Sequence, residues 1–278
     1  MTDPHQYCRD KAAASGSSLH YSLLFLPPER RDAAIALHAY CREIDDVVDE
    51  CSDPGVARTK LTWWHDEIAR LYAGQARHPV AQALAGLIRP YAIAAEELDS
   101  IIAGTAMDLE YNRYPDFDTL KTYCRRTSGT ASLISARICG SSDPRTPDAA
   151  AELGTAFRLT SMIRNVGKDA RHNRIYLPLD ELARHGIDAS QLVHGRDSPA
   201  FRELIAMQID RALGIFDQAL AMLPAQDRRA QLSGRIMAAL CRALLEEIRA
   251  DGCRVLTHRT SLTPLRKLWI AAKTRFKG

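Results

Sequence analysis

Proline and turn residues divide most of the chain into segments of helical length, and this spacing constrains the fold more than any other feature. The turn clusters lie at Pro27–Pro28, Asp53–Gly55, His78–Pro79, Tyr114–Asp116 and Ser142–Pro144. Helical spacing of apolar residues predicts helices at about 30–49, 57–74, 80–89, 94–112, 116–139, 147–171, 199–222 and 230–251. No alternating run is long enough for a sheet, and the alternative of a tetratricopeptide solenoid lacks its period of about 34 residues. We therefore predict an all-α, single-domain helix bundle over residues 1–278.

Composition and cysteine usage exclude several classes of protein. The chain is 46% hydrophobic and 26% charged with a formal net charge of +3, so nucleic acid is not an expected partner. Its seven cysteines are scattered without a Cys-x-x-Cys pair, which argues against disulfides and a cysteine zinc site. No signal peptide is visible, nor an apolar run of about 18 residues. We expect a cytoplasmic protein without a membrane-spanning helix.

The segment EIDDVVDE, residues 43–50, carries five carboxylates in two helical turns. On a helix Asp45 lies above Asp49, and Asp46 lies above Glu50, so each pair of like charges is unfavourable unless a cation binds it. Carboxylate oxygens at this spacing suit Mg²⁺, which also bridges to phosphate oxygens. The alternative is a solvated acidic helix face. The apolar residues between the acids favour a partly buried helix, and buried acids need partners.

A second segment, SMIRNVGKDARHNRIYLP at residues 161–178, supplies a candidate opposite wall. Asn165 and Asp169 are four residues apart on an apolar helix. The surrounding cations suit phosphate oxygens, and they are Arg164, Lys168, Arg171 and Arg174. The alternative is a basic helix end, where cations are favoured by the helix dipole. Together the two segments predict a site for diphosphate and Mg²⁺.

These two segments resemble the aspartate-rich motifs of the squalene/phytoene synthase family. The first motif is matched by Asp45 and Asp49, and the second by Asn165 and Asp169 followed by RIYLP. YCRRTSGTASLISARICG from Tyr123, KAAASGSSLHYSLLFLPPERR near the start and DGCRVLTHRTSLTPLRKLW near the end also look like family segments. The resemblance implies an isoprenoid-synthase-type helix bundle around a central cavity. Within the family, CREIDDVVDECSDPGVARTKL and MDLEYNRYPDFDTL look most like bacterial presqualene diphosphate synthases of the hopanoid pathway.

The resemblance implies a reaction and a set of site residues. Two farnesyl diphosphates would be joined head to head to presqualene diphosphate, with Mg²⁺ or Mn²⁺ and without NADPH. The implied catalytic residues are Tyr123, Asp45, Asp49 and Asp169. The implied metal ligands are Asp45, Asp46, Asp49, Asn165 and Asp169. The implied substrate-binding residues are Ser17, Ser18, Tyr21, Arg42, Ser128, Arg164, Arg174, Tyr176 and Arg259.

The second motif departs from the family pattern. Where the family usually has Gln, Asn, Asp, Glu and Asp, this chain has Arg158, Ser161, Asn165, Lys168 and Asp169. The changes make this wall far more positive, which disfavours Mg²⁺, although Lys168 or Arg158 can hold diphosphate directly. Two alternatives therefore stay open: another head-to-head synthase with a phytoene-like or hydroxysqualene product, and a non-catalytic relative that binds a prenyl lipid or a protein.

The C-terminal segment at about 262–278 is basic and amphipathic. Leu265, Leu268, Trp269 and Ile270 alternate with Arg266, Lys267 and further cations. This pattern is typical of a helix that lies on a membrane surface, and the alternative is a solvated terminal helix. The expected partners are farnesyl diphosphate, the inner face of the membrane and other enzymes of the squalene and hopanoid pathways. His38 has no second ligand at a metal spacing and is expected to be structural.

Overall fold

The computed structural model describes residues 3–15, 18–51 and 53–276. Its α-helices are α1 (Pro4–Ala14), α2 (Leu19–Leu23), α3 (Pro28–Glu50), α4 (Pro54–Tyr72), α5 (Pro79–Ala85), α6 (Ala95–Ala106), α7 (Phe117–Cys124), α8 (Thr130–Cys139), α9 (Thr146–Arg171), α10 (Leu179–Arg184), α11 (Ala189–Val193), α12 (Pro199–Met222), α13 (Leu232–Ala250) and α14 (Pro264–Phe276). Within those ranges no β-strand forms, and the β-pairing is an isolated bridge between Arg113 and Ile175. The predicted all-α architecture is confirmed.

The helix starts explain why the turn clusters marked the boundaries well. Proline stands in the first turn of α1, α3, α4, α5, α9 and α12, where its missing N–H has no intrahelical partner to lose. Asp53 caps α4 by accepting from the Gly55 and Val56 amides, at 2.6 and 3.1 Å. Asp116 caps α7 through the Thr119 amide at 2.8 Å. Each side chain accepts a bond from an amide that the helix itself leaves unpaired.

Three predicted helices end differently from expectation. The segment at 116–139 is α7 and α8 joined by a π turn at Arg125–Gly129. In this turn the Thr127 hydroxyl bonds to the Tyr123 carbonyl, and the Thr130 hydroxyl to the Arg125 carbonyl. The segments at 94–112 and 80–89 end as α-helices at Ala106 and Ala85. Helices α2, α10 and α11, of five or six residues, are too short for a periodic signal, and α1 was also not predicted.

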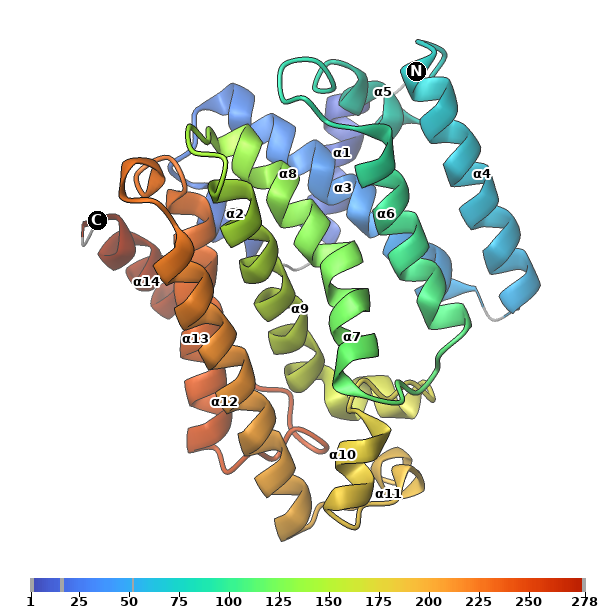
Figure 1. The fold of residues 1–278 in the computed structure, drawn as a ribbon, viewed down its shortest axis with the longest axis vertical. Coiled ribbons are helices and arrows are strands. Elements are labelled where there is room, and N and C mark those ends of the chain that lie inside the picture. Colours follow the sequence, from blue (N-terminus) through green and yellow to red (C-terminus); the bar gives the residue numbers. More distant parts are fainter. Residues whose placement is uncertain (1–2, 16–17, 52, 277–278) are drawn as a thin grey trace.

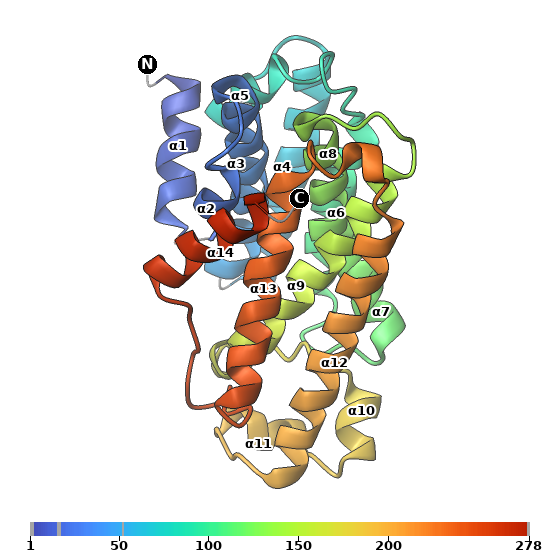
Figure 2. The ribbon, with the colours of Figure 1, turned by 90° about the vertical axis from the view of Figure 1, so that its left-hand side faces the viewer.

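Helices α8 and α9 lie between the two halves of the molecule (Figure 1). The helices α1, α3, α4 and α6 lie to one side of them, and α12, α13 and α14 to the other (Figures 1 and 2). Two groups of buried apolar side chains correspond to these halves: one is centred on α3, α4 and α6, and the other on α9, α12 and α13. Helix α8 belongs to the first group and packs against α9 of the second, so α9 carries the second motif along the boundary between the halves.

Two glycines let other backbone segments approach α9 closely. A Cβ at Gly154 would lie 2.2 Å from the Ser128 carbonyl oxygen, so α9 meets the π turn backbone to backbone. A Cβ at Gly167 would lie 2.2 Å from the Leu256 carbonyl oxygen. The Gly167 amide also donates to the Val255 carbonyl at 3.2 Å. These contacts fix where the segment after α13, which carries Arg259, lies relative to the second motif.

In the portion of the chain that is described, no helix combines the length and the apolar character that a membrane crossing needs.

Candidate active site

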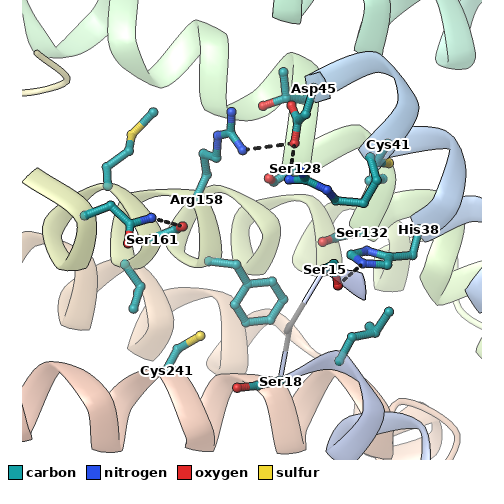
Figure 3. A pocket seen from close by; sticks show the side chains of 18 of the residues that line it. Ser15, Ser18, His38, Cys41, Asp45, Ser128, Ser132, Arg158, Ser161 and Cys241 are labelled. Carbon is teal, nitrogen blue, oxygen red and sulfur yellow. Dashed lines mark hydrogen bonds and ion pairs between the residues drawn. The ribbon is translucent and has the colours of Figure 1, made fainter. Parts of the chain in front are cut away.

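A cavity of about 1220 Å³ opens between α3, α8, α9 and α13, and Figure 3 shows part of its lining. Its character changes along α9. Ala150, Leu153 and Phe157 line it in the first half of the helix, whereas Arg158 and the second motif line it in the second half. The part of α9 that borders the cavity, from Ala150 to Asp169, rises by about 28 Å. The cavity therefore combines a charged end with a long interior lined by apolar and small hydroxyl side chains.

On the α3 wall, both acids of the first motif face the cavity and already have arginine partners. Asp45 Oδ2 lies 3.5 Å from an Arg158 guanidinium nitrogen (Figure 3) and 3.7 Å from one of Arg42. Asp49 Oδ1 lies 2.6 Å from Arg174, which also donates to the Val48 carbonyl at 2.7 Å. The like charges of the predicted motif are thus offset by side chains of the opposite wall.

Asp46, predicted as a metal ligand beside Asp45, is not among the residues that line the cavity. Its carboxylate pairs with Lys11 of α1 at 2.9 Å and with Arg42. Adjacent residues on a helix point about 100° apart, so Asp45 and Asp46 cannot face the same cavity equally. The signal that distinguishes them lies in α1, which the sequence did not reveal as a helix.

On the α9 wall, the side-chain oxygen of Asn165 accepts hydrogen bonds from two arginines. Its Oδ1 is 3.1 Å from Arg259 Nε and 3.3 Å from Arg164 Nε. Burial lowers the pKa of Arg164, and nearby Arg259 lowers it further. Burial also lowers the pKa of Lys267, and Arg164 and Arg259 add to the shift. In the described residues no carboxylate forms an ion pair with Arg164, Arg259 or Lys267. This cation cluster lines the cavity and suits an anion.

Asp108 is a site residue that the motifs did not identify. Its carboxylate is buried and accepts hydroxyl bonds from Tyr114 at 2.8 Å, Tyr123 at 3.0 Å and Tyr176 at 2.9 Å. Burial raises the pKa of Asp108, while Arg158 and the tyrosine hydroxyls act in the opposite direction. The only sequence signal was its place in the family-like segment MDLEYNRYP.

Tyr123 is fully buried and does not line the cavity. The Arg158 guanidinium lies over its ring at 5.0 Å and also donates to its hydroxyl. Burial raises the pKa of Tyr123 well above its usual value, so the phenol stays neutral. Its neighbours Arg158 and Tyr176 do line the cavity. Tyr123 therefore contacts the cavity lining through Arg158 and through Asp108, which accepts from its hydroxyl.

The other predicted substrate-binding residues divide into three groups. The cavity is lined by Ser18, Arg42, Ser128, Arg164, Arg174, Tyr176 and Arg259. Tyr21 does not line it, because its ring packs under Lys267, whose ammonium lies 5.4 Å from the ring centroid. Ser17 lies outside the described residues.

The side chains of the charged end do not fit the predicted two-sided Mg²⁺ site. Within the described ranges, no group of three or more His, Cys, Asp or Glu residues could hold a metal ion. Asp45 and Asp49 supply hard oxygen ligands, but Asn165, Lys168 and Asp169 face them with a single acid. Burial raises the pKa of that acid, Asp169, to about 6. The charged end is instead rich in cations that can bind an anion directly.

His38 gives a testable pH dependence. It lines the cavity beside Ser15, whose hydroxyl oxygen is 3.3 Å from His38 Nε2 (Figure 3). Burial lowers its pKa from 6.5 to about 4, and Arg42 contributes. The pKa of His38 is thus lower in the folded chain than in the unfolded chain. Its contribution to stability is complete above pH 6.5 and is lost as the pH falls from 6.5 to about 4. We expect His38→Gln to remove about 2 kcal/mol of the stability difference between about pH 7 and pH 4, measured by urea unfolding. An unchanged difference would contradict this assignment.

The comparisons with known proteins settle the family. The squalene/phytoene synthase family model matches residues 12–266. The chain belongs to the squalene/phytoene synthase family. Among its family relatives, a phytoene synthase of Arthrospira platensis is 30% identical, over 96% of this chain and 91% of that protein. A 15-cis-phytoene synthase of Synechococcus elongatus is 32% identical with the same coverage of both chains.

Solved structures of the family confirm the fold. A dehydrosqualene synthase bound to a ligand matches with a TM-score of 0.86 at 19% identity, over 99% of this chain and 96% of that one. Squalene synthase HpnC from Alicyclobacillus acidocaldarius matches with a TM-score of 0.79 at 24% identity, over 90% and 94%. The expected isoprenoid-synthase-type bundle is therefore confirmed.

Proposed function

We propose that this chain joins two farnesyl diphosphates head to head, giving presqualene diphosphate, one free diphosphate and a proton. The observation that carries the proposal is the cavity, which has a charged end between the two motif helices and an interior lined by apolar and small hydroxyl side chains. Its volume of about 1220 Å³ exceeds the range of roughly 300–1,000 Å³ that suits one drug-sized ligand. Two prenyl chains can share the interior while both diphosphates stay at the charged end.

The reaction needs the leaving diphosphate to be neutralised. The allylic C–O bond of one substrate breaks, and its electron pair leaves with the diphosphate. The double bond of the second substrate attacks the cation, and loss of a proton closes the cyclopropane ring. Arg158, Lys168 and the cation cluster (Arg164, Arg259 and Lys267) supply positive charge where the diphosphate charge grows. The aromatic side chains of Phe157 and Tyr176 are among the residues that line the cavity, and aromatic rings can stabilise a carbocation.

The arginines that pair with Asp45 and Asp49 have a second role in this proposal. When a diphosphate arrives, Arg158 and Arg174 can turn from the carboxylates to its oxygens. Cationic side chains then supply part of the neutralisation that the family resemblance assigns to Mg²⁺ or Mn²⁺. We propose that the dependence of this chain on divalent metal is correspondingly weak, and that no nicotinamide cofactor takes part.

Two other functions each have an observation in their favour. The phytoene synthases among the relatives favour a longer prenyl substrate and a phytoene-like product. The loss of acids from the second motif, together with the arginine partners of Asp45 and Asp49, favours a relative that binds prenyl diphosphate without turnover. Product identity distinguishes the first alternative, and diphosphate release distinguishes the second.

The test is an incubation of the purified chain with farnesyl diphosphate, with and without Mg²⁺ and without nicotinamide. We expect presqualene diphosphate by mass spectrometry and one diphosphate released for every two substrates consumed. A parallel incubation with geranylgeranyl diphosphate is expected to give slower release. Release from neither substrate would favour the non-catalytic alternative, and faster release from the longer substrate would favour the phytoene-like one.

Asp45→Asn and Asp46→Asn form a matched pair for the same assay, because they remove the same charge from adjacent residues of α3. Asp45 faces the cavity and Asp46 faces Lys11. We expect the larger loss of diphosphate release from Asp45→Asn. Equal losses would contradict the placement of the reaction on the cavity side of α3.

A further inference from the structure

Helix α14 carries an apolar stripe that faces away from the rest of the protein. Leu265 is 80% exposed, Leu268 49%, Trp269 58% and Phe276 85%. These residues recur at spacings of three, four and seven, so they share one face of the helix. The opposite face holds Ile270 and Ala271, which are buried against the core. The exposed stripe is therefore additional to the face that attaches α14 to the bundle.

Cations lie on both sides of this stripe. Lys273 follows Trp269 by one turn, with its ammonium 4.5 Å from the Trp269 ring centroid. Arg275 lies on the other side, 4.7 Å from the ring centroid of Phe25, which is itself exposed and extends the apolar surface. Arg266 lies beside the stripe near the start of the helix and pairs with Glu247 of α13. An apolar face flanked by cations is the pattern of a helix that lies in the plane of a bilayer.

We propose that the outward face of α14, with Phe25, docks on a lipid bilayer that contains anionic headgroups. The large side chains would enter the boundary between headgroups and acyl chains, and Lys273 and Arg275 would lie at the level of the phosphates. The charge pattern favours a bilayer over a protein partner, because the core of a protein interface is depleted of lysine.

The position of α14 connects this surface with the cavity. Helix α14 packs across α2 and α13, and it lies at the front in Figure 2. Lys267 at its start lines the cavity, as do Ser261 and Leu262 just before it. If the proposed function holds, a prenyl diphosphate dissolved in the bilayer would meet the cavity beside the docked helix. The docking itself does not depend on catalysis.

The test is flotation of the full chain with vesicles, without substrate. One set contains phosphatidylcholine alone and the other contains phosphatidylcholine with about a third phosphatidylglycerol. We expect binding to the anionic vesicles and at least tenfold weaker binding after Leu268→Ser/Trp269→Ser. The double variant Lys273→Glu/Arg275→Glu is expected to lose most binding to the anionic set, since each cation contributes about fivefold.

Trp63→Ser is the matched control. Trp63 is also an exposed tryptophan, at 42%, but it belongs to α4 on the opposite side of the molecule (Figure 1). We expect this variant to bind vesicles as the unchanged chain does. Circular dichroism of every variant identifies loss of fold, and an α14 double variant that keeps its helix content but still binds as the unchanged chain does would overturn the proposal. Absence of binding by the unchanged chain would overturn it too, as would self-association through α14 in sedimentation without lipid. Diphosphate release measured on the same samples tests the proposed function separately.

Discussion

The double variant Asn165→Asp/Lys168→Glu is expected to make diphosphate binding about 100-fold more dependent on Mg²⁺. In the unchanged chain, Asn165 Oδ1 accepts from Arg164 and Arg259, and Lys168 faces the cavity beside them. The two substitutions make the α9 wall three charges more negative. At separations of a few ångströms in a partly buried cavity, such a change is worth at least about 3 kcal/mol for a divalent cation.

The measurement is calorimetric titration of inorganic diphosphate with Mg²⁺ and with a chelator in its place. The unchanged chain is expected to bind similarly under both conditions, because its cations hold the anion directly. Arg171→Glu is a suitable control, since it changes the charge by two units on the same helix but outside the cavity lining. It is expected to leave the ratio of diphosphate affinities with Mg²⁺ and with chelator within about twofold, because an exposed charge outside the cavity is screened by salt. Strong Mg²⁺ dependence in the unchanged chain would contradict the proposed role of the cations.

Asp108→Asn is expected to lower the free energy of unfolding by about 3 kcal/mol. Three tyrosine hydroxyls donate to the two oxygens of Asp108, and Arg158 lies close enough to affect its pKa. The amide keeps one acceptor oxygen, so at least one hydroxyl loses its bond and Arg158 loses a counter-charge. Hydrogen bonds to charged groups contribute about 1.5–3 kcal/mol each.

Chemical unfolding of Asp108→Asn alongside Tyr114→Phe tests this prediction. Tyr114→Phe removes one hydroxyl from the same cluster and keeps the carboxylate, so we expect a loss of about 1–2 kcal/mol. The comparison belongs at about pH 8, where the raised pKa of Asp108 has the least effect on its charge. Equal losses for the two variants would mean that the tyrosines do not depend on the carboxylate charge.

Local patterns predicted the long helices and the two motif walls, because α3 and α9 each carry their own periodicity, proline start and charge spacing. Contacts between residues that are distant in the sequence could not be predicted from local patterns. Asp46 looked equivalent to Asp45 until α1 placed Lys11 beside it. Asp108 lacked a motif, because its three partners come from three different segments. The residues that depart from the family pattern in the second motif did predict a cation-rich α9 wall. They did not predict that Arg158 and Arg174 pair with Asp45 and Asp49.

The backbone contact at Gly154 limits how this scaffold can evolve a different substrate length. Because α9 touches the π turn without any side chain between them, the spacing of these two walls cannot widen by exchanging a residue at the contact. A longer chain must be accommodated by residues that project into the apolar interior, such as Phe157 and Cys139. Divergence in the length of chain accepted is therefore expected to follow the volume of the side chains that line the cavity, with the helix framework unchanged.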